Sequence, residues 1–105
     1  MILYQMHRKH ESDWREMLLK LGSRVKAQRK ILGLSQGKLG EMAGLHRTYV
    51  ADIERGARNL TFLNLARLAE PLQMSVSELC HGIVRARKNL AKEEDSSRDL
   101  RQEAA

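Results

Sequence analysis

Residues 35–56, "SQGKLGEMAGLHRTYVADIERG", constrain the fold more than any other part of the chain. Ser35 is a good helix N-cap. Gly44 and Gly56 suit helix ends, because glycine adopts the left-handed conformation without a steric penalty. The segment therefore predicts two short helices, 36–43 and about 46–55, joined by a tight turn.

Two helices joined by so short a turn must cross closely, and the sequence has the residues that this requires. A small residue is needed on the first helix, and Gly40 is there. Apolar residues must hold the pair against a core, and the segment offers Leu39, Met42, Leu45, Val50 and Ile53. Together these positions predict a helix-turn-helix arrangement.

A longer helix is predicted ahead of this pair, within residues 14–32. Asp13 with Glu16 three positions later resembles a capping box. Gly22 weakens the middle of the helix, because glycine is a poor helix former. Its apolar residues follow helical spacing: Trp14, Leu18, Leu21, Val25 and Leu32.

Two more short helices are predicted after the pair. Thr61 caps one, which Pro71 stops, and Ser75 or Ser77 caps the other. Their apolar positions are Leu63, Ala66, Leu68, Val76 and Leu79. We expect an all-α fold, a compact five-helix bundle. Its parts would be an N-terminal extension (1–16), a helix-turn-helix domain (17–80) and a charged tail, helical or disordered (81–105).

The positive charge of the chain is compatible with nucleic-acid binding but does not distinguish a nucleic-acid-binding protein from other proteins. The net charge is +6, with eight Lys and Arg against three acids in residues 1–35 and five of each in 36–82. The single cysteine, Cys80, fits a reducing compartment. No apolar run approaches the roughly 18 residues of a membrane span, and the start is too short and polar for a secretory signal. We expect a cytoplasmic protein without a cofactor or metal.

The outer side of the predicted helix 46–55 carries a polar stripe. At about 100° per residue, Val50 and Ile53 mark the inner side. Thr48, Ala51, Asp52 and Arg55 then fall on the opposite side, and Arg47 lies at the N-terminal end. Such a helix fits the DNA major groove, about 12 Å wide, where arginine pairs with guanine and threonine contacts a thymine methyl or a polar base edge.

The chain from Leu18 to Leu79 resembles the phage-repressor or Cro-like helix-turn-helix family. The segments that match, in order, are "LGSRVKAQRKILGLSQ", "LGEMAGLHRTYVADIERG", "RNLT" and "LARLAEPLQMSVSEL". Within that family, "RTY", "IERG" and "RNLT" are most similar to controller proteins of restriction–modification systems. Controller proteins are small homodimers that bind paired operator sites on double-stranded DNA and regulate their own and the endonuclease's transcription. The resemblance implies a sequence-specific DNA-binding regulator of transcription that reads a near-palindromic operator, either a restriction–modification controller or an autoregulatory repressor.

The resemblance also implies roles for single residues. Arg47 and Thr48 match base-reading positions, with Ala51 and Asp52 on the same face. Backbone-contacting or supporting positions are matched by Ser35, Gln36, Tyr49, Arg55, Arg58 and Asn59. Arg24 and Glu54 match a structural ion pair between the first helix and the recognition helix.

Two residues depart from the family pattern. His46 stands where the family often has Ser or Thr, which predicts a weaker cap or a pH-sensitive group near phosphate. Pro71 replaces an ordinary helix former and is expected to shift the corner where family dimers often pack.

A homodimer is expected, because one short recognition helix reads few base pairs. Candidate interface residues are Leu72, Met74, Val76, Leu79 and Ile83, and burial in the core of one subunit is an equally good interpretation of each. The spacing of Leu79, Ile83, Ala86 and Leu90 resembles a fragment of a heptad seam, which then fails at Glu93 and Ser97.

Two other classes of function, an enzyme and a protein-interaction module, are alternatives to DNA binding. A metal site or a nucleophile is suggested by two pairs, Cys80 with His81 and His7 with His10. The sequence has no phosphate-binding loop or acidic cluster to accompany them. We therefore do not expect the chain to be an enzyme. An antitoxin or interaction module, binding a partner protein through the extension or the tail, is the alternative. Steep loss of affinity for duplex DNA with added salt distinguishes the DNA reader from it.

Overall fold

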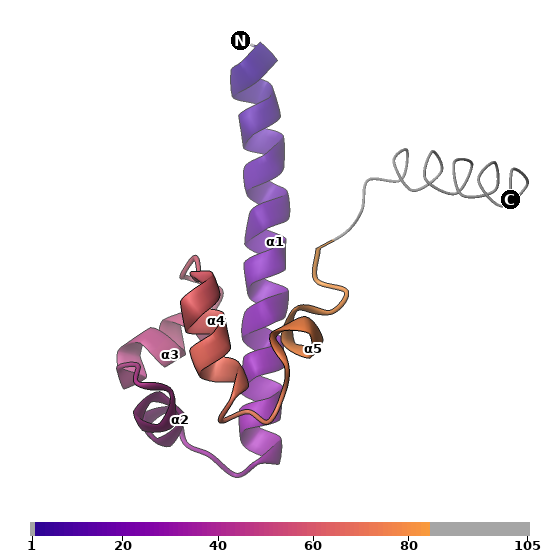
Figure 1. Cartoon of the computed structure of the whole chain (residues 1–105). Coiled ribbons are helices and arrows are strands. Elements are labelled where there is room, and N and C mark those ends of the chain that lie inside the picture. Colours follow the sequence, from indigo (N-terminus) through magenta and orange to yellow (C-terminus); the bar gives the residue numbers. More distant parts are fainter. Residues whose placement is uncertain (1, 85–105) are drawn as a thin grey trace, which may run out of the picture.

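Helix α1 spans Ile2–Ile31, so it begins well before the predicted start near Trp14. The computed structural model describes the backbone of residues 2–84 and the side chains of residues 13–84. Neither proline nor glycine occurs before Trp14, and the helix therefore continues through the Asp13–Glu16 signal without a break. In Figure 1 the N-terminal half of α1 stands clear of the other helices.

Four shorter helices follow: α2 (Gln36–Ala43), α3 (Arg47–Glu54), α4 (Phe62–Ala69) and α5 (Val76–Cys80). They gather around the C-terminal half of α1, with α2, α3 and α4 on one side of it and α5 on the other (Figure 1). The predicted all-α class is confirmed, and the bounds of α2 and α3 agree with the sequence-based expectation within a residue. No helix among the described residues is long and apolar enough to cross a membrane.

The predicted caps are present. The Ser35 hydroxyl accepts from the Lys38 N–H at 3.0 Å, and the Thr61 hydroxyl accepts from the Asn64 N–H at 3.1 Å. Ser75, rather than Ser77, caps α5 in a reciprocal capping box with Glu78. These bonds satisfy backbone donors that a helix start otherwise leaves unpaired.

The hydrophobic core is built mainly from residues at the predicted positions. Its members are Leu21, Val25, Leu39, Ala43, Val50, Ile53, Leu68, Ala69, Leu72, Leu79 and Ile83. The expectation for Met42 was wrong, since it is 51% exposed. The buried face of α2 is centred on Leu39, Gly40 and Ala43, which turns Met42 outward. Leu63 on α4 is likewise exposed, contrary to the prediction, whereas Leu68 is buried as predicted and Ala69 is buried as well.

Three of the predicted dimer residues belong to this core. Leu72 and Leu79 are fully buried and Ile83 is 6% exposed, so these side chains offer a second subunit almost no surface. Their alternative interpretation, burial within one subunit, is the right one. Met74 and Val76 are partly buried against the same core and keep some free surface. Ala86 and Leu90 of the heptad fragment lie outside the described residues.

Two glycines allow backbones to approach closely. A Cβ on Gly22 would lie 2.3 Å from the carbonyl oxygen of Ile53, where α1 crosses the end of α3. A Cβ on Gly40 would lie 2.4 Å from the carbonyl oxygen of Leu45 in the α2–α3 turn. The predicted requirement at Gly40 is confirmed. Gly22, which the sequence suggested only as a weak point in a helix, is where α1 and α3 fit together.

Candidate nucleic-acid interface

The α2–α3 turn has the geometry predicted from its glycines. Gly44 adopts the left-handed conformation with φ of 71°, and its N–H bonds back to carbonyl groups of α2. Leu45 follows in the turn, and its N–H donates to the Gly40 carbonyl at 2.8 Å. These backbone bonds help to fix the turn and set the start of α3 relative to α2.

His46 is the N-cap of α3. Its Nδ1 accepts a hydrogen bond from the N–H of Thr48 at 3.1 Å, and its backbone is extended as an N-cap requires. The sequence predicted a weaker cap at this position. The cap is present, and an imidazole nitrogen takes the place of the hydroxyl oxygen that Ser or Thr would supply.

The base-reading residues predicted on α3 lie on its outer side. Val50 and Ile53 are buried, while Arg47 and Thr48 are exposed at the N-terminal end. Ala51 and Asp52 are half-buried on the same side. Among the described residues, Arg47 makes no side-chain hydrogen bond or ion pair and is free to reach a ligand.

Asp52 is engaged by two arginines. Arg55 Nη2 pairs with Asp52 Oδ1, and Arg58 Nε donates to Asp52 Oδ2 at 3.2 Å. The Asp52 side chain is only 15% exposed, against 69% for Arg55 and 54% for Arg58. These bonds, chiefly the one from Arg55, hold the pKa of the Asp52 carboxyl below its ordinary value. The carboxylate assigned to base reading thus faces the arginines assigned to the DNA backbone.

Tyr49 continues this cluster toward α4. The Arg58 guanidinium lies over the Tyr49 ring, 5.4 Å from its centroid. The Tyr49 hydroxyl accepts from Asn64 Nδ2 at 2.8 Å. Asn64 was not identified from the sequence. Its position in the first turn of α4 beside "RNLT" is the only local signal that could have suggested it.

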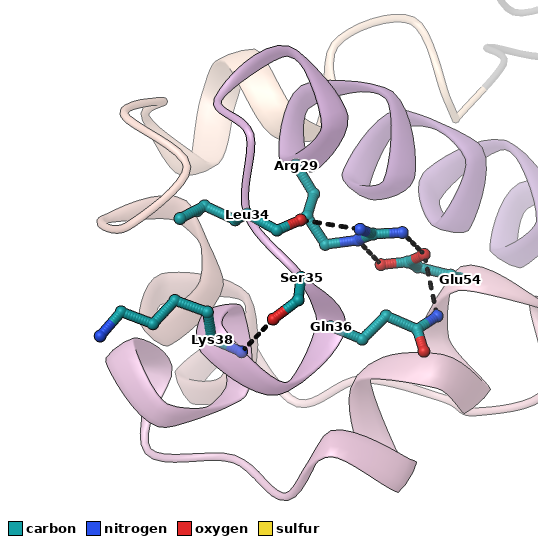
Figure 2. Close-up of polar contacts among 6 residues, drawn as sticks. All are labelled: Arg29, Leu34, Ser35, Gln36, Lys38 and Glu54. Atoms are coloured by element: carbon teal, nitrogen blue, oxygen red, sulfur yellow. Dashed lines mark hydrogen bonds and ion pairs between the residues drawn. The ribbon is translucent and has the colours of Figure 1, made fainter.

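A buried ion pair anchors α3 to α1, but its partner differs from the predicted one. Glu54 pairs with Arg29, not with Arg24, through bonds of 2.7 Å (Nε–Oε2) and 2.9 Å (Nη2–Oε1). Figure 2 shows the two groups face to face, with the Gln36 amide beside them. Bonding to Glu54 raises the pKa of the Arg29 guanidinium above its ordinary value. The predicted structural role of Glu54 is therefore supported, and the assignment to Arg24 is wrong.

Arg24 has a different task. Its Nη1 donates to the carbonyl oxygens of Leu79 at 3.0 Å and His81 at 2.6 Å, at the C-terminal end of α5. A cation there satisfies unpaired carbonyls and complements the helix dipole. Arg24 and Arg29 are five residues apart on α1, which places them on different sides of the helix.

The same ion pair orients the start of α2. Gln36 Nε2 donates to Glu54 Oε1 at 3.2 Å, and Arg29 Nη1 donates to the Leu34 carbonyl at 2.8 Å (Figure 2). Arg29 and Glu54 therefore hold the loop before α2, the first residue of α2 and the end of α3 together. Ser35 caps α2 at an exposed position, and Asn59 is exposed between α3 and α4.

Of the residues considered for a metal site or nucleophile, the structure describes the side chains of Cys80 and His81. Cys80 is half-buried at the end of α5, and His81 follows as its C-cap. The side chains of His7 and His10 lie outside the described residues. No group of three His, Cys, Asp or Glu that could hold a metal ion occurs among the side chains that the structure describes.

A family model described as helix-turn-helix matches residues 25–79, slightly more than half of the chain. The chain belongs to the helix-turn-helix family. The match starts at Val25 in the core stripe of α1 and ends at Leu79 in α5, so it takes in α2, α3, α4 and the buried ion pair.

Relatives of this helix-turn-helix chain include controller proteins. Control protein C.SmaI from Serratia marcescens is 46% identical over 59 residues, which cover 56% of this chain and 70% of that protein. The restriction-modification controller protein C.AhdI from Aeromonas hydrophila is 42% identical, with a TM-score of 0.58 over 59% of this chain and 94% of that one. SinR, a master regulator for biofilm formation solved in complex with DNA, is 35% identical, with a TM-score of 0.54 over 56% and 95%.

Proposed function

We propose that this chain is a sequence-specific DNA-binding regulator of transcription that places α3 in the major groove. The observation that carries the proposal is the outer face of α3. Arg47 and Thr48 are exposed and unobstructed at its N-terminal end, and Arg55 and Arg58 are exposed at its C-terminal end. Base-reading groups flanked by backbone-binding cations are the arrangement that a groove-binding helix needs.

The structure supports α3 as the reading helix in a second way. The buried Arg29–Glu54 pair, the close approach at Gly22 and the left-handed turn at Gly44 all fix the angle at which α3 leaves the bundle. Because these contacts already hold α3 in one orientation, the helix loses less conformational freedom when it binds a ligand. The DNA-bound structure of SinR, over which this chain aligns, favours duplex DNA over a protein as the ligand of that face.

Two finer points belong to the same proposal. The similarity to C.SmaI and C.AhdI favours a controller of a restriction–modification system, acting in the cytosol. An α3 of eight residues reads few base pairs. We therefore propose a homodimer, with two copies of α3 about 34 Å apart on a near-palindromic operator. Met74 and Val76 are the predicted interface residues that keep surface for a partner.

Duplex binding as a function of salt tests the proposal. A protein that neutralises several phosphates loses about 10³–10⁵ in affinity between about 50 and 200 mM salt. The Arg58→Ala variant should show a smaller slope, because one phosphate contact is gone. Lys20→Ala, which removes the same charge from the α1–α5 side, should keep the wild-type slope. Binding that ignores salt, or equal slopes for the two variants, would contradict the proposal.

A further inference from the structure

Asp52 lies in the proposed reading face, yet its carboxylate is poorly placed to read a base. Both of its oxygens are bonded to arginines, and the side chain is 15% exposed. A carboxylate aimed at DNA is also repelled by the phosphates. The position of Asp52 therefore needs an explanation other than contact with a base edge.

The two arginines gain orientation from Asp52. Arg55 closes α3 as its C-cap, and Arg58 lies in the loop beyond it, so the two guanidinium groups come from different segments. One carboxylate bridges them, with Oδ1 bonded to Arg55 and Oδ2 to Arg58. Without this bridge, two exposed and flexible side chains would lose much rotamer freedom on meeting a phosphate.

Arg58 is held from a second direction. Its guanidinium lies over the Tyr49 ring, and the Tyr49 hydroxyl is fixed by Asn64 of α4. An arginine has five N–H donors, and Arg58 uses its Nε for Asp52. Its Nη groups have no partner among the described residues and remain available for a phosphate. The contacts hold the arginine in place and leave its outer donors free.

We propose that Asp52 is a positioning residue that holds Arg55 and Arg58 together as a clamp on one stretch of DNA backbone at the C-terminal end of α3. This role rests on the DNA binding proposed above and replaces base reading for this residue. Asp52 also offsets one of the two positive charges. The reduced charge lowers the affinity of the clamp for any duplex. The oriented arginines bind the DNA backbone only when α3 lies in the major groove of its specific site. Asp52 therefore increases the ratio of specific to non-specific affinity.

The test compares two duplexes of equal length: the one most enriched by the wild-type chain from a random pool, and a scrambled version of it. Asp52→Asn keeps the size of the side chain and removes its charge. Its affinity for the scrambled duplex should rise, its salt slope should steepen by up to about 0.9, and the specific-to-scrambled ratio should fall about tenfold. Asp52→Glu keeps the charge but displaces the oxygens, so the ratio should fall without a gain on the scrambled duplex.

Glu41→Gln is the matched charge control, because Glu41 is an exposed acid on α2 with no contact to the clamp. It should change both affinities in the same proportion and preserve the ratio. In an Arg58→Ala background, Asp52→Asn should alter the ratio far less than in the wild type, since the clamp is already broken.

Two results would overturn the inference while leaving DNA binding intact. If Asp52→Asn raised both affinities together, Asp52 would act through charge alone. If it relaxed discrimination at a single base pair, Asp52 would read that base. Failure of the wild-type chain to enrich any duplex is a different outcome, which would overturn the proposed function and the clamp with it.

Discussion

The Arg29 guanidinium and the Glu54 carboxylate form a two-point ion pair where α1, α2 and α3 meet (Figure 2). Their side chains are 10% and 3% exposed. A buried pair of this kind costs much when one partner is lost, because the other charge is left without compensation. The main consequence of the pair is that it fixes the position of α3. Its net contribution to the free energy of unfolding is smaller, because burying the two charges also has a cost.

Glu54→Ala should lower the melting temperature and reduce the free energy of unfolding by about 3–5 kcal/mol. Arg29→Ala should cost a similar amount, and the double variant should cost clearly less than the two losses combined. In a double-mutant cycle measured by urea unfolding, Arg29 and Glu54 should couple by about 1 kcal/mol or more. Arg24→Ala is the control, because Arg24 binds the end of α5. Stronger coupling of Glu54 to Arg24 than to Arg29 would contradict this assignment.

Gly22→Ala should destabilise the protein although alanine is the better helix former. The added Cβ would meet backbone oxygens of Ile53 and Glu54, which cannot move without shifting α3. We expect a loss of about 1–3 kcal/mol. Gly37→Ala is the matched variant, since its Cβ would meet only the Ser35 hydroxyl oxygen at 3.9 Å, and it should gain about 0.5–1 kcal/mol. Thermal melts that move in the same direction for both variants would argue against close approach at Gly22.

His46→Ala should cost about 0.5–2 kcal/mol, the usual loss on removal of an N-cap. His46→Ser should restore the stability, because a hydroxyl oxygen can accept the Thr48 N–H in place of Nδ1. Urea unfolding of the three proteins at neutral pH measures this. Equal losses for the alanine and serine variants would show that the imidazole acts through packing and not as a cap.

Asp52 should contribute to the loss of folding stability as the pH falls below neutral. Its folded-state pKa lies below the ordinary value of 3.8 because of Arg55 and Arg58. The unfolded chain therefore takes up the proton first. The stabilisation is fully present above about pH 4 and is lost as the pH falls through the folded-state pKa below it. Between about pH 5 and pH 3, the melting temperature of Asp52→Asn should fall less than that of the wild type. Identical falls would show that the bridge to the arginines adds nothing to stability.

Features set by nearby residues could be predicted from the sequence. The bounds of α2, the caps at Ser35 and Thr61 and the left-handed turn at Gly44 each depend on contacts within a few residues. The outward face of α3 also followed from spacing alone, once Val50 was assigned to the core. The start of α1 was not predicted correctly. Asp13 and Glu16 resemble a capping box, but the residues before them are already helical, so the helix does not begin there.

Contacts between distant segments were harder to predict. A resemblance assigned Glu54 to Arg24, whereas Arg29 lies four residues after Val25 in the apolar stripe of α1. A charged residue in that stripe must find a partner, and this was the signal in the sequence. The bridge from Asp52 to Arg58 and the Asn64–Tyr49 bond depend on how the loop after α3 returns to α4, which no local pattern specifies.

The most direct test of the central claim, that α3 reads base edges through Arg47, is selection from a random duplex pool by the wild-type chain and Arg47→Ala side by side. The wild type should enrich a near-palindrome with a guanine at one fixed position of each half-site. The variant should bind about 1–3 kcal/mol more weakly and enrich the same motif with that one position relaxed. An identical motif for both proteins, or no motif for the wild type, would contradict the account.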